Sequence, residues 1–185
     1  KNHSKFSSTC YDERYMTTKS ILIIGNWKMY PNSLPNARKL IRLLGRTPRN
    51  SHLDVALAPP FPYLQEALSR RTSLAAQDVF WEKEGAFTGE ISPLMLKGLG
   101  VRYVILGHSE RRRWLGETDD MVNRKLKAVL EARLEPIVCI GEHKRDPDGS
   151  FFSFLKAQIS QSLVKIKKDY IPRITFAYEP IWAVG

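Results

Sequence analysis

Six short runs of apolar residues recur along the chain, and most of them are nearly continuous rather than alternating with polar residues. They span residues 21–25, 53–58, 72–77, 101–106, 135–140 and 173–178. A continuous apolar run of this length is typical of a strand that is buried on both faces, as in a parallel sheet. The pattern therefore predicts six parallel strands.

Apolar residues spaced for one face of a helix lie in three of the intervals between these strands. They recur at 37, 40, 41 and 44, at 122, 126, 129 and 130, and at 155, 159, 163 and 166. Pro35 and Pro93 stand where a first helical turn would begin, and Ser92 is a predicted N-cap. This alternation predicts an α/β fold, either a doubly wound sheet or a (β/α)₈ barrel. The absence of G-x-G-x-x-G after a strand disfavours the dinucleotide-binding form.

Composition narrows the class of protein. The chain has 185 residues, of which 43% are hydrophobic, so it is too apolar for a disordered protein and fits one domain or part of one. The longest purely aliphatic run, residues 21–24, is too short to span a membrane. The net charge of +10 favours an anionic partner, but the basic residues are scattered and form no nucleic-acid-binding motif. Two cysteines in unlike contexts argue against a disulfide scaffold and favour a reducing compartment.

The N-terminal segment differs from the rest of the chain. Residues 1–15 are polar and contain no apolar core long enough for a signal peptide. We interpret residues 1–20 as an extension outside the folded unit at 21–185, and Met16 as a hypothetical translation start.

Polar side chains close most of the predicted strands, and strand ends are the usual place for a barrel active site. These residues are Asn26, Lys28, Gln77, His108, Glu142 and Glu179. If strand alternation continues past the first run, Asn26 and Lys28 point to the same side, where Lys could hold an anion. The alternative is a lysine that extends into solvent.

The segment after the fourth run contains a histidine at a predicted helix start. Ser109 can cap this helix, and the helix dipole would then favour a neutral His108 that donates its N–H to a carbonyl oxygen. The alternative is a loop histidine bonded to backbone. The three arginines at 111–113 are predicted to be a solvated helix start.

Two apolar loops also require explanation. Glu179 follows a buried strand and precedes an apolar segment, residues 181–184. Apolar residues in a loop suggest a lid that covers a site. The long loop around 85–90 carries Phe80, Trp81 and Phe87, which would be costly to leave in water. This loop either inserts into a partner subunit or folds back on its own sheet.

Seven motifs together resemble the triosephosphate isomerase family, in the order and spacing of that family. They are GNWKM at 25–29, AQDV at 76–79, GAFTGE at 85–90, GHSERR at 107–112, GETD at 116–119, PIVCIGE at 136–142 and AYEPIWAVG at 177–185. The resemblance runs from about residue 21 to residue 185. It implies a TIM barrel, here with about six βα units, and interconversion of dihydroxyacetone phosphate and D-glyceraldehyde 3-phosphate in glycolysis and gluconeogenesis.

The resemblance also assigns roles to residues. Glu179 matches the catalytic base, His108 the neutral electrophile, Lys28 the cation and Asn26 a hydrogen-bond donor at the substrate oxygens. Ser109 and Glu110 match supporting residues that lie near the base and the lysine. Asn26, Lys28 and Gly185 match substrate-binding positions, and Gln77 and Thr88 match dimer contacts. The resemblance implies a phosphorylated triose as substrate, a cytoplasmic homodimer, and no metal, organic cofactor, nucleic-acid or membrane partner.

The length of the chain leads to a further expectation. A barrel of this type typically has about 250 residues, so we expect about 85 residues to be missing after position 185. Six strands cannot close an eight-stranded barrel, and we therefore expect this chain alone to be unstable and essentially inactive. The alternatives are another phosphosugar (β/α)₈ enzyme and a non-catalytic fragment that acts by binding, for example to nucleic acid.

Overall fold

The computed structural model describes residues 21–44, 52–68 and 72–183, and the six predicted strands are all present in it. They are β1 (Ile21–Asn26), β2 (Leu53–Ala58), β3 (Ser73–Ala76), β4 (Tyr103–Leu106), β5 (Glu135–Ile140) and β6 (Thr175–Tyr178). All pairs are parallel, and the strand order in the sheet is the order in the sequence. This order excludes a doubly wound sheet, in which the strand order reverses at a switch point.

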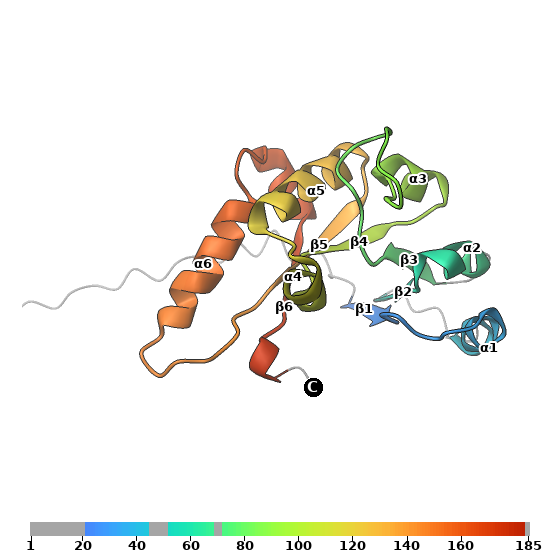
Figure 1. Ribbon diagram of the computed structural model, residues 1–185, viewed down its shortest axis with the longest axis horizontal. Coiled ribbons are helices and arrows are strands. Elements are labelled where there is room, and N and C mark those ends of the chain that lie inside the picture. The colour runs from blue at the N-terminus through green and yellow to red at the C-terminus, as the bar shows by residue number, and fades with distance from the viewer. Residues whose placement is uncertain (1–20, 45–51, 69–71, 184–185) are drawn as a thin grey trace, which may run out of the picture.

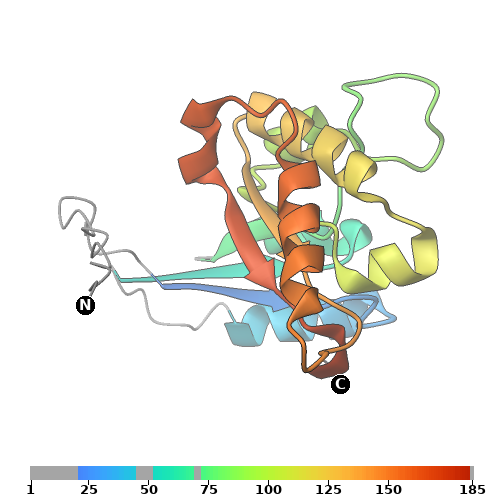
Figure 2. The same cartoon turned by 90° about the vertical axis from the view of Figure 1, so that its left-hand side faces the viewer.

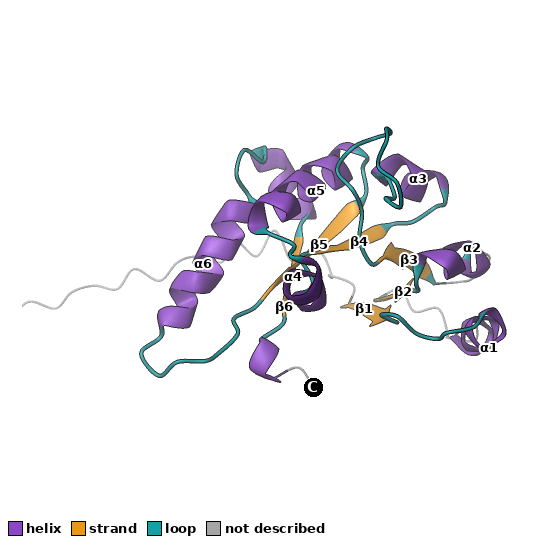
Figure 3. Cartoon of the chain, in the orientation of Figure 1, coloured by secondary structure: helices purple, strands orange, loops and turns teal. Residues whose placement is uncertain are grey.

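Helices cover the outside of the curved sheet (Figure 1; Figure 3). They are α1 (Leu34–Leu44), α2 (Leu64–Ala67), α3 (Pro93–Gly98), α4 (Ser109–Leu115), α5 (Asp119–Glu131) and α6 (Ser150–Ser162), with 3₁₀ turns η2 (Phe61–Tyr63), η3 (Lys168–Arg173) and η4 (Ile181–Ala183). The architecture is therefore a partial (β/α)₈ barrel with six parallel strands, as predicted. None of the helices in the described ranges is long and apolar enough to cross a membrane.

The inner strands are buried on both faces, which explains their continuous apolar sequences. On β4, Val104 and Leu106 face outward and pack with the helices, whereas Tyr103 and Ile105 face the inside of the sheet. The inner cluster otherwise consists of small and aliphatic side chains from β2, β3 and β5: Ala56, Ala58, Ala75, Ile137 and Cys139. With apolar layers on both sides, polar groups are left to the ends of the strands.

Local signals fix the helix boundaries. The hydroxyl of Ser92 accepts a hydrogen bond from the backbone N–H of Met95, so the predicted N-cap is confirmed. The predicted periodic helix over 155–166 is wrong at its end, because α6 stops at Ser162. Lys165 has a φ of 57°, which ends the helical path, although Ile166 still packs against the outer core.

The prediction that residues 111–113 form a solvated helix start is wrong for Arg111 and Arg112, which pair with Asp78 and Asp119. Arg111 and Lys125 form ion pairs with Asp78 and Glu117, and the side chains of Asp78, Glu117 and Lys125 are almost fully buried. The Lys125 ammonium lies 2.7 Å from Asp78 Oδ1 and also contacts Glu117 Oε1. Burial raises the pKa of Asp78, although the cations of this ionic quartet act in the opposite direction.

The two edge strands are the least buried. The outward side chains of β1, Ile21 and Ile23, are 65% and 50% exposed, and Tyr178 at the end of β6 is 47% exposed. Within the described residues, β1 is hydrogen-bonded only to β2 and β6 only to β5. In Figure 2 β6, drawn in red, lies towards the viewer beside helix α6.

Replacing Lys125 with Met is expected to lower the free energy of unfolding by about 3–5 kcal/mol. The substitution leaves buried carboxylates without their nearest cation, which is among the most costly changes in a protein interior. Urea denaturation followed by circular dichroism measures the effect.

Lys39→Met is the matched control, because Lys39 lies exposed on α1. We expect its free energy of unfolding to stay within about 0.5 kcal/mol of the unmodified chain. Equal losses for the two variants would contradict a structural role for the ionic quartet.

Candidate active site

Three of the predicted site residues lie at the carboxyl ends of separate strands. Asn26 ends β1, His108 follows β4 after Gly107, and Glu179 directly follows β6. His108 Nε2 lies 3.6 Å from Glu179 Oε1, although the two residues are 71 positions apart in the sequence. Parallel pairing thus places an imidazole and a carboxylate from distant segments side by side.

The orientation of His108 is set by the first turn of α4. Its Nδ1 accepts a hydrogen bond of 3.3 Å from the backbone N–H of Glu110, so His108 itself is the N-cap. The prediction that Ser109 caps this helix is therefore wrong, because Ser109 is already its first residue. An acceptor Nδ1 carries no proton, which leaves the proton of a neutral ring on Nε2, on the side of Glu179.

Lys28 reaches the site from a turn rather than from a strand. Its φ of 54° takes the chain out of the extended path after Asn26, so the alternation argument does not apply to this pair. Instead, the Asn26 side-chain oxygen accepts a hydrogen bond of 2.9 Å from the Lys28 backbone N–H. The Lys28 ammonium lies 2.7 Å from Glu110 Oε1, and its side chain is 40% exposed. An accessible cation therefore lies next to the turn that carries His108.

The backbone around Glu179 is held against β5. The Glu179 N–H donates to the Ile140 carbonyl at 2.8 Å. A Cβ at Gly141 would collide with the Glu179 carbonyl oxygen, so this close approach requires glycine. Glu179 and Ser109 both line a small cavity, and so does Cys139, a buried thiol whose pKa is raised by burial and by the nearby Glu179.

Glu142 anchors the segment that follows Glu179. Its carboxylate accepts hydrogen bonds from Trp182 Nε1 at 2.9 Å and from the Tyr178 hydroxyl at 2.8 Å, and Arg145 Nε lies 3.2 Å away. Burial raises the pKa of Glu142, but these hydrogen bonds and that of its own backbone outweigh burial and lower the pKa to about 2. The sequence placed Glu142 at a strand end, but gave no signal for its partners.

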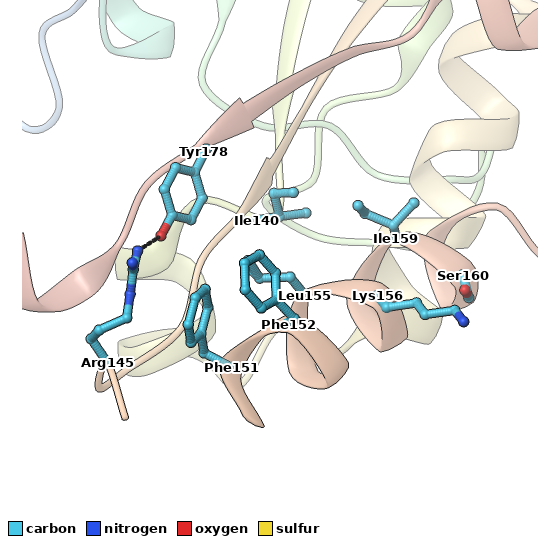
Figure 4. Close-up of a pocket in the computed structure, with 9 residues that line it drawn as sticks. All are labelled: Ile140, Arg145, Phe151, Phe152, Leu155, Lys156, Ile159, Ser160 and Tyr178. Carbon is cyan, nitrogen blue, oxygen red and sulfur yellow. Dashed lines mark hydrogen bonds between the residues drawn. The ribbon is translucent and has the colours of Figure 1, made fainter. Parts of the chain in front are cut away.

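A separate groove of about 510 Å³ lies beside α6, and no predicted site residue lines it. Figure 4 shows Phe151, Phe152 and Leu155 from the helix on one side and Tyr178 with Arg145 on the other. Tyr178 and Glu179 are neighbours on the chain, yet the first faces this groove and the second faces His108. The groove is therefore distinct from the cluster of strand-end residues.

Gln77, which was predicted as a dimer contact, makes hydrogen bonds within its own chain. Its Nε2 donates to the carbonyl oxygens of Lys28 at 2.9 Å and Ala58 at 2.7 Å. Gln77 thus connects the turn that carries Lys28 to the ends of β2 and β3. Gly185, which was predicted to bind substrate, lies outside the described residues.

The aromatic residues of the long loop contact one another. The ring centroids of Phe80 and Trp81 are 4.1 Å apart, and those of Phe80 and Phe87 are 4.7 Å apart. Thr88, the other predicted dimer contact, is exposed, and Phe87 is 43% exposed. Packing within the loop covers part of this apolar surface and leaves part of it free.

Comparison with known sequences gives the family. The family model described as triosephosphate isomerase matches residues 21–185. This chain belongs to the triosephosphate isomerase family. A triosephosphate isomerase of Thermoanaerobacter sp. (strain X514) is 44% identical over 169 residues, which is 89% of this chain and 68% of the relative. That of Fusobacterium nucleatum is 42% identical over 172 residues, with 90% and 68% covered, and that of Chloroflexus aurantiacus is 44% identical over 170 residues, with 89% and 68% covered.

The stabilising effect of Glu142 is expected to depend on pH. Because the pKa of Glu142 falls from 4.5 to about 2 on folding, its contribution to stability is present above pH 4.5. It is lost as the pH falls towards 2. The free energy of unfolding of the unmodified chain minus that of Glu142→Gln, measured by denaturation at several pH values, should therefore shrink over this range.

Glu131→Gln is the control, since Glu131 is exposed on α5. Its difference from the unmodified chain should show no comparable loss below pH 4.5. A Glu142→Gln difference that stayed constant from pH 6 to pH 2.5 would contradict the anchoring role.

Proposed function

We propose that the strand-end residues catalyse the interconversion of dihydroxyacetone phosphate and D-glyceraldehyde 3-phosphate through an enediolate. The observation that carries the proposal is the pairing of His108 Nε2 with Glu179 Oε1 at 3.6 Å, with the Lys28 ammonium close to the same turn. Aldose–ketose isomerisation needs a base on carbon, an acid on oxygen and a cation for an anionic substrate. Family membership supports this assignment.

Glu179 acts as the base. Its carboxylate removes a proton from the hydroxymethyl carbon next to the substrate carbonyl and later returns a proton to the former carbonyl carbon. The side chain is 26% exposed and sits on backbone that is fixed against β5. A fixed carboxylate keeps the reacting atoms in line, and misplacement by about 1 Å can cost about 100-fold in rate.

His108 acts as the electrophile. Its Nε2–H donates to the carbonyl oxygen, protonates it as the enediolate forms, and then takes a proton from the neighbouring hydroxyl oxygen. The backbone hydrogen bond to Nδ1 keeps the neutral ring in the tautomer with the proton on Nε2. A neutral donor with a preset direction needs no reorganisation during proton transfer.

Lys28 and Asn26 stabilise negative charge. The ammonium attracts the phosphate dianion and the developing enediolate oxygen, and Asn26 holds the turn that presents it. Glu110 contacts the ammonium at 2.7 Å and limits the directions in which it can point. Ser109 lines the same small cavity as the base, which supports its role beside Glu179.

Water exclusion sets a further requirement. An enediolate that carries a phosphate needs a dry site, because solvent weakens charge stabilisation and promotes side reactions. Glu179 and Lys28 remain partly exposed, and β1 and β6 have no strand partner on their outer edges among the residues that the structure describes. We therefore propose that the 185-residue chain alone turns over slowly.

The partner and the location are part of the proposal. The exposed Phe87 and the neighbouring Thr88 support a homodimer in which this loop is covered by a second copy. A cytoplasmic location is supported by family membership, and by Cys139, which is a free thiol.

Glu179→Asp is expected to lower kcat about 100-fold or more with a much smaller change in KM. The substitution withdraws the carboxylate by one methylene, and proton transfer depends on that distance. The assay uses a chimera of this chain with the remaining C-terminal third of the Thermoanaerobacter relative, and follows aldehyde formation from dihydroxyacetone phosphate.

Two comparisons complete this experiment. Glu131→Asp, on the exposed side of α5, should leave kcat unchanged, and the 185-residue chain should turn over at least about 100-fold more slowly than the chimera. Unchanged kcat in Glu179→Asp would remove Glu179 from the role of base. A chimera that acts on another phosphosugar but not on triose phosphate would indicate a different enzyme.

Lys28→Met in the same chimera should weaken binding of dihydroxyacetone phosphate by about tenfold or more. The reason is the loss of a charge-assisted contact to the phosphate dianion, worth roughly 1.5–3 kcal/mol. Titration calorimetry measures the affinity. Lys39→Met provides the control for a change in net charge alone, and retained affinity in Lys28→Met would overturn the role of Lys28 as anion clamp.

A further inference from the structure

Arg112 connects the turn before His108 to the start of the next helix. From the second turn of α4 its Nε donates to the Gly107 carbonyl oxygen at 2.8 Å, and its Nη1 lies 2.6 Å from Asp119 Oδ1 at the start of α5. Only 15% of the side chain is exposed. One planar guanidinium therefore ties together three consecutive pieces of the chain, which a lysine could not do with the same geometry.

The space around Gly107 admits no side chain. Gly107 has a φ of 67°, and a Cβ there would lie 2.8 Å from Arg112 Nη2 and 2.9 Å from Val122 Cγ2. The backbone directly before His108 is thus packed between the guanidinium and α5. Because of this packing, a displacement of the Arg112 guanidinium would also displace the peptide that joins Gly107 to His108.

Arg112 also borders the space occupied by the base. It lines the same cavity of about 10 Å³ as Glu179. Arg112 Nη2 and Glu179 Oε2 are both buried, and neither has a hydrogen-bond partner within the described part of the chain. The Arg112 side chain thus borders the cavity that contains the base, while its Nε holds the turn that precedes His108.

We propose that Arg112 is a positioning residue, which fixes the direction of the His108 imidazole relative to Glu179. It acts through the Gly107 carbonyl and does not touch the substrate. The inference rests on the proposed function, since that function gives His108 and Glu179 their roles. This role distinguishes Arg112 from the other arginines of the run 111–113. Arg111 belongs to the ionic quartet, and Arg113 stacks on the exposed Trp114.

The test measures the His108 ring itself in the chimera with the C-terminal third of the Thermoanaerobacter relative. Nitrogen NMR of histidine-labelled protein distinguishes the tautomer with an unprotonated Nδ1, and His108→Gln identifies its signals. In Arg112→Met we expect the ratio of this tautomer to the other to fall about tenfold, which corresponds to the loss of one hydrogen bond. Arg112→Lys can reach only one of the two acceptors. Its tautomer ratio should therefore lie between that of the unmodified protein and that of Arg112→Met.

Arg113→Met is the matched control, because it removes a neighbouring arginine on the exposed side of the same helix. It should leave the tautomer ratio unchanged. Amide hydrogen exchange separates positioning from general destabilisation: Arg112→Met should speed exchange of the Glu110 N–H at least tenfold more than that of Val104 in β4. If exchange accelerates equally at both sites, or the tautomer ratio does not move in Arg112→Met and Arg112→Lys, the proposal is overturned.

This readout does not depend on turnover. Failure of the proposed function would appear in the kinetics of Glu179→Asp, with the His108 tautomer unaffected. Failure of the positioning role would appear in the spectra, with the Glu179 kinetics as proposed.

Discussion

Parallel pairing of the strands in sequence order determines where the candidate site residues lie. Each strand pairs in parallel with its neighbour in the chain, so all six carboxyl ends lie at the same end of the sheet. Asn26 ends β1, His108 follows β4 and Glu179 follows β6, so this arrangement puts all three at the same end of the sheet. Apolar clusters occupy both faces of the inner strands, so polar side chains gather at the strand ends, where they can be paired or reach solvent.

Paired charges fix the segments that carry the residues at the carboxyl ends of the strands. Arg111 and Lys125 neutralise the buried carboxylates of Asp78 and Glu117, while Arg112 binds the Gly107 carbonyl and Asp119. These contacts lie on segments adjacent to His108. A similar arrangement occurs after β6, where Glu142 receives hydrogen bonds from Tyr178 and Trp182 on either side of Glu179. Both catalytic candidates thus sit on backbone that charged side chains hold in place.

Much of this was predictable from the sequence, and the exceptions have physical reasons. Six strands, three amphipathic helices and the Ser92 cap follow from local patterns, because burial on one or both faces determines which residues are apolar. The use of Arg111 and Arg112 in buried contacts could not be read from the sequence, since an arginine run looks the same whether solvent or carboxylates surround it. The Ser109 cap failed because a histidine can also accept the capping N–H. Lys28 departed from alternation because a positive φ follows the strand.

The proposed reaction transfers a proton between a substrate carbon and groups that exchange protons with solvent. Deuterium incorporation from heavy water into dihydroxyacetone phosphate by the chimera with the Thermoanaerobacter C-terminal third measures this transfer. We expect deuterium on the hydroxymethyl carbon next to the carbonyl, and its loss in Glu179→Gln. Isomerisation without any solvent deuterium, or equal incorporation by Glu179→Gln, would contradict the proposed reaction.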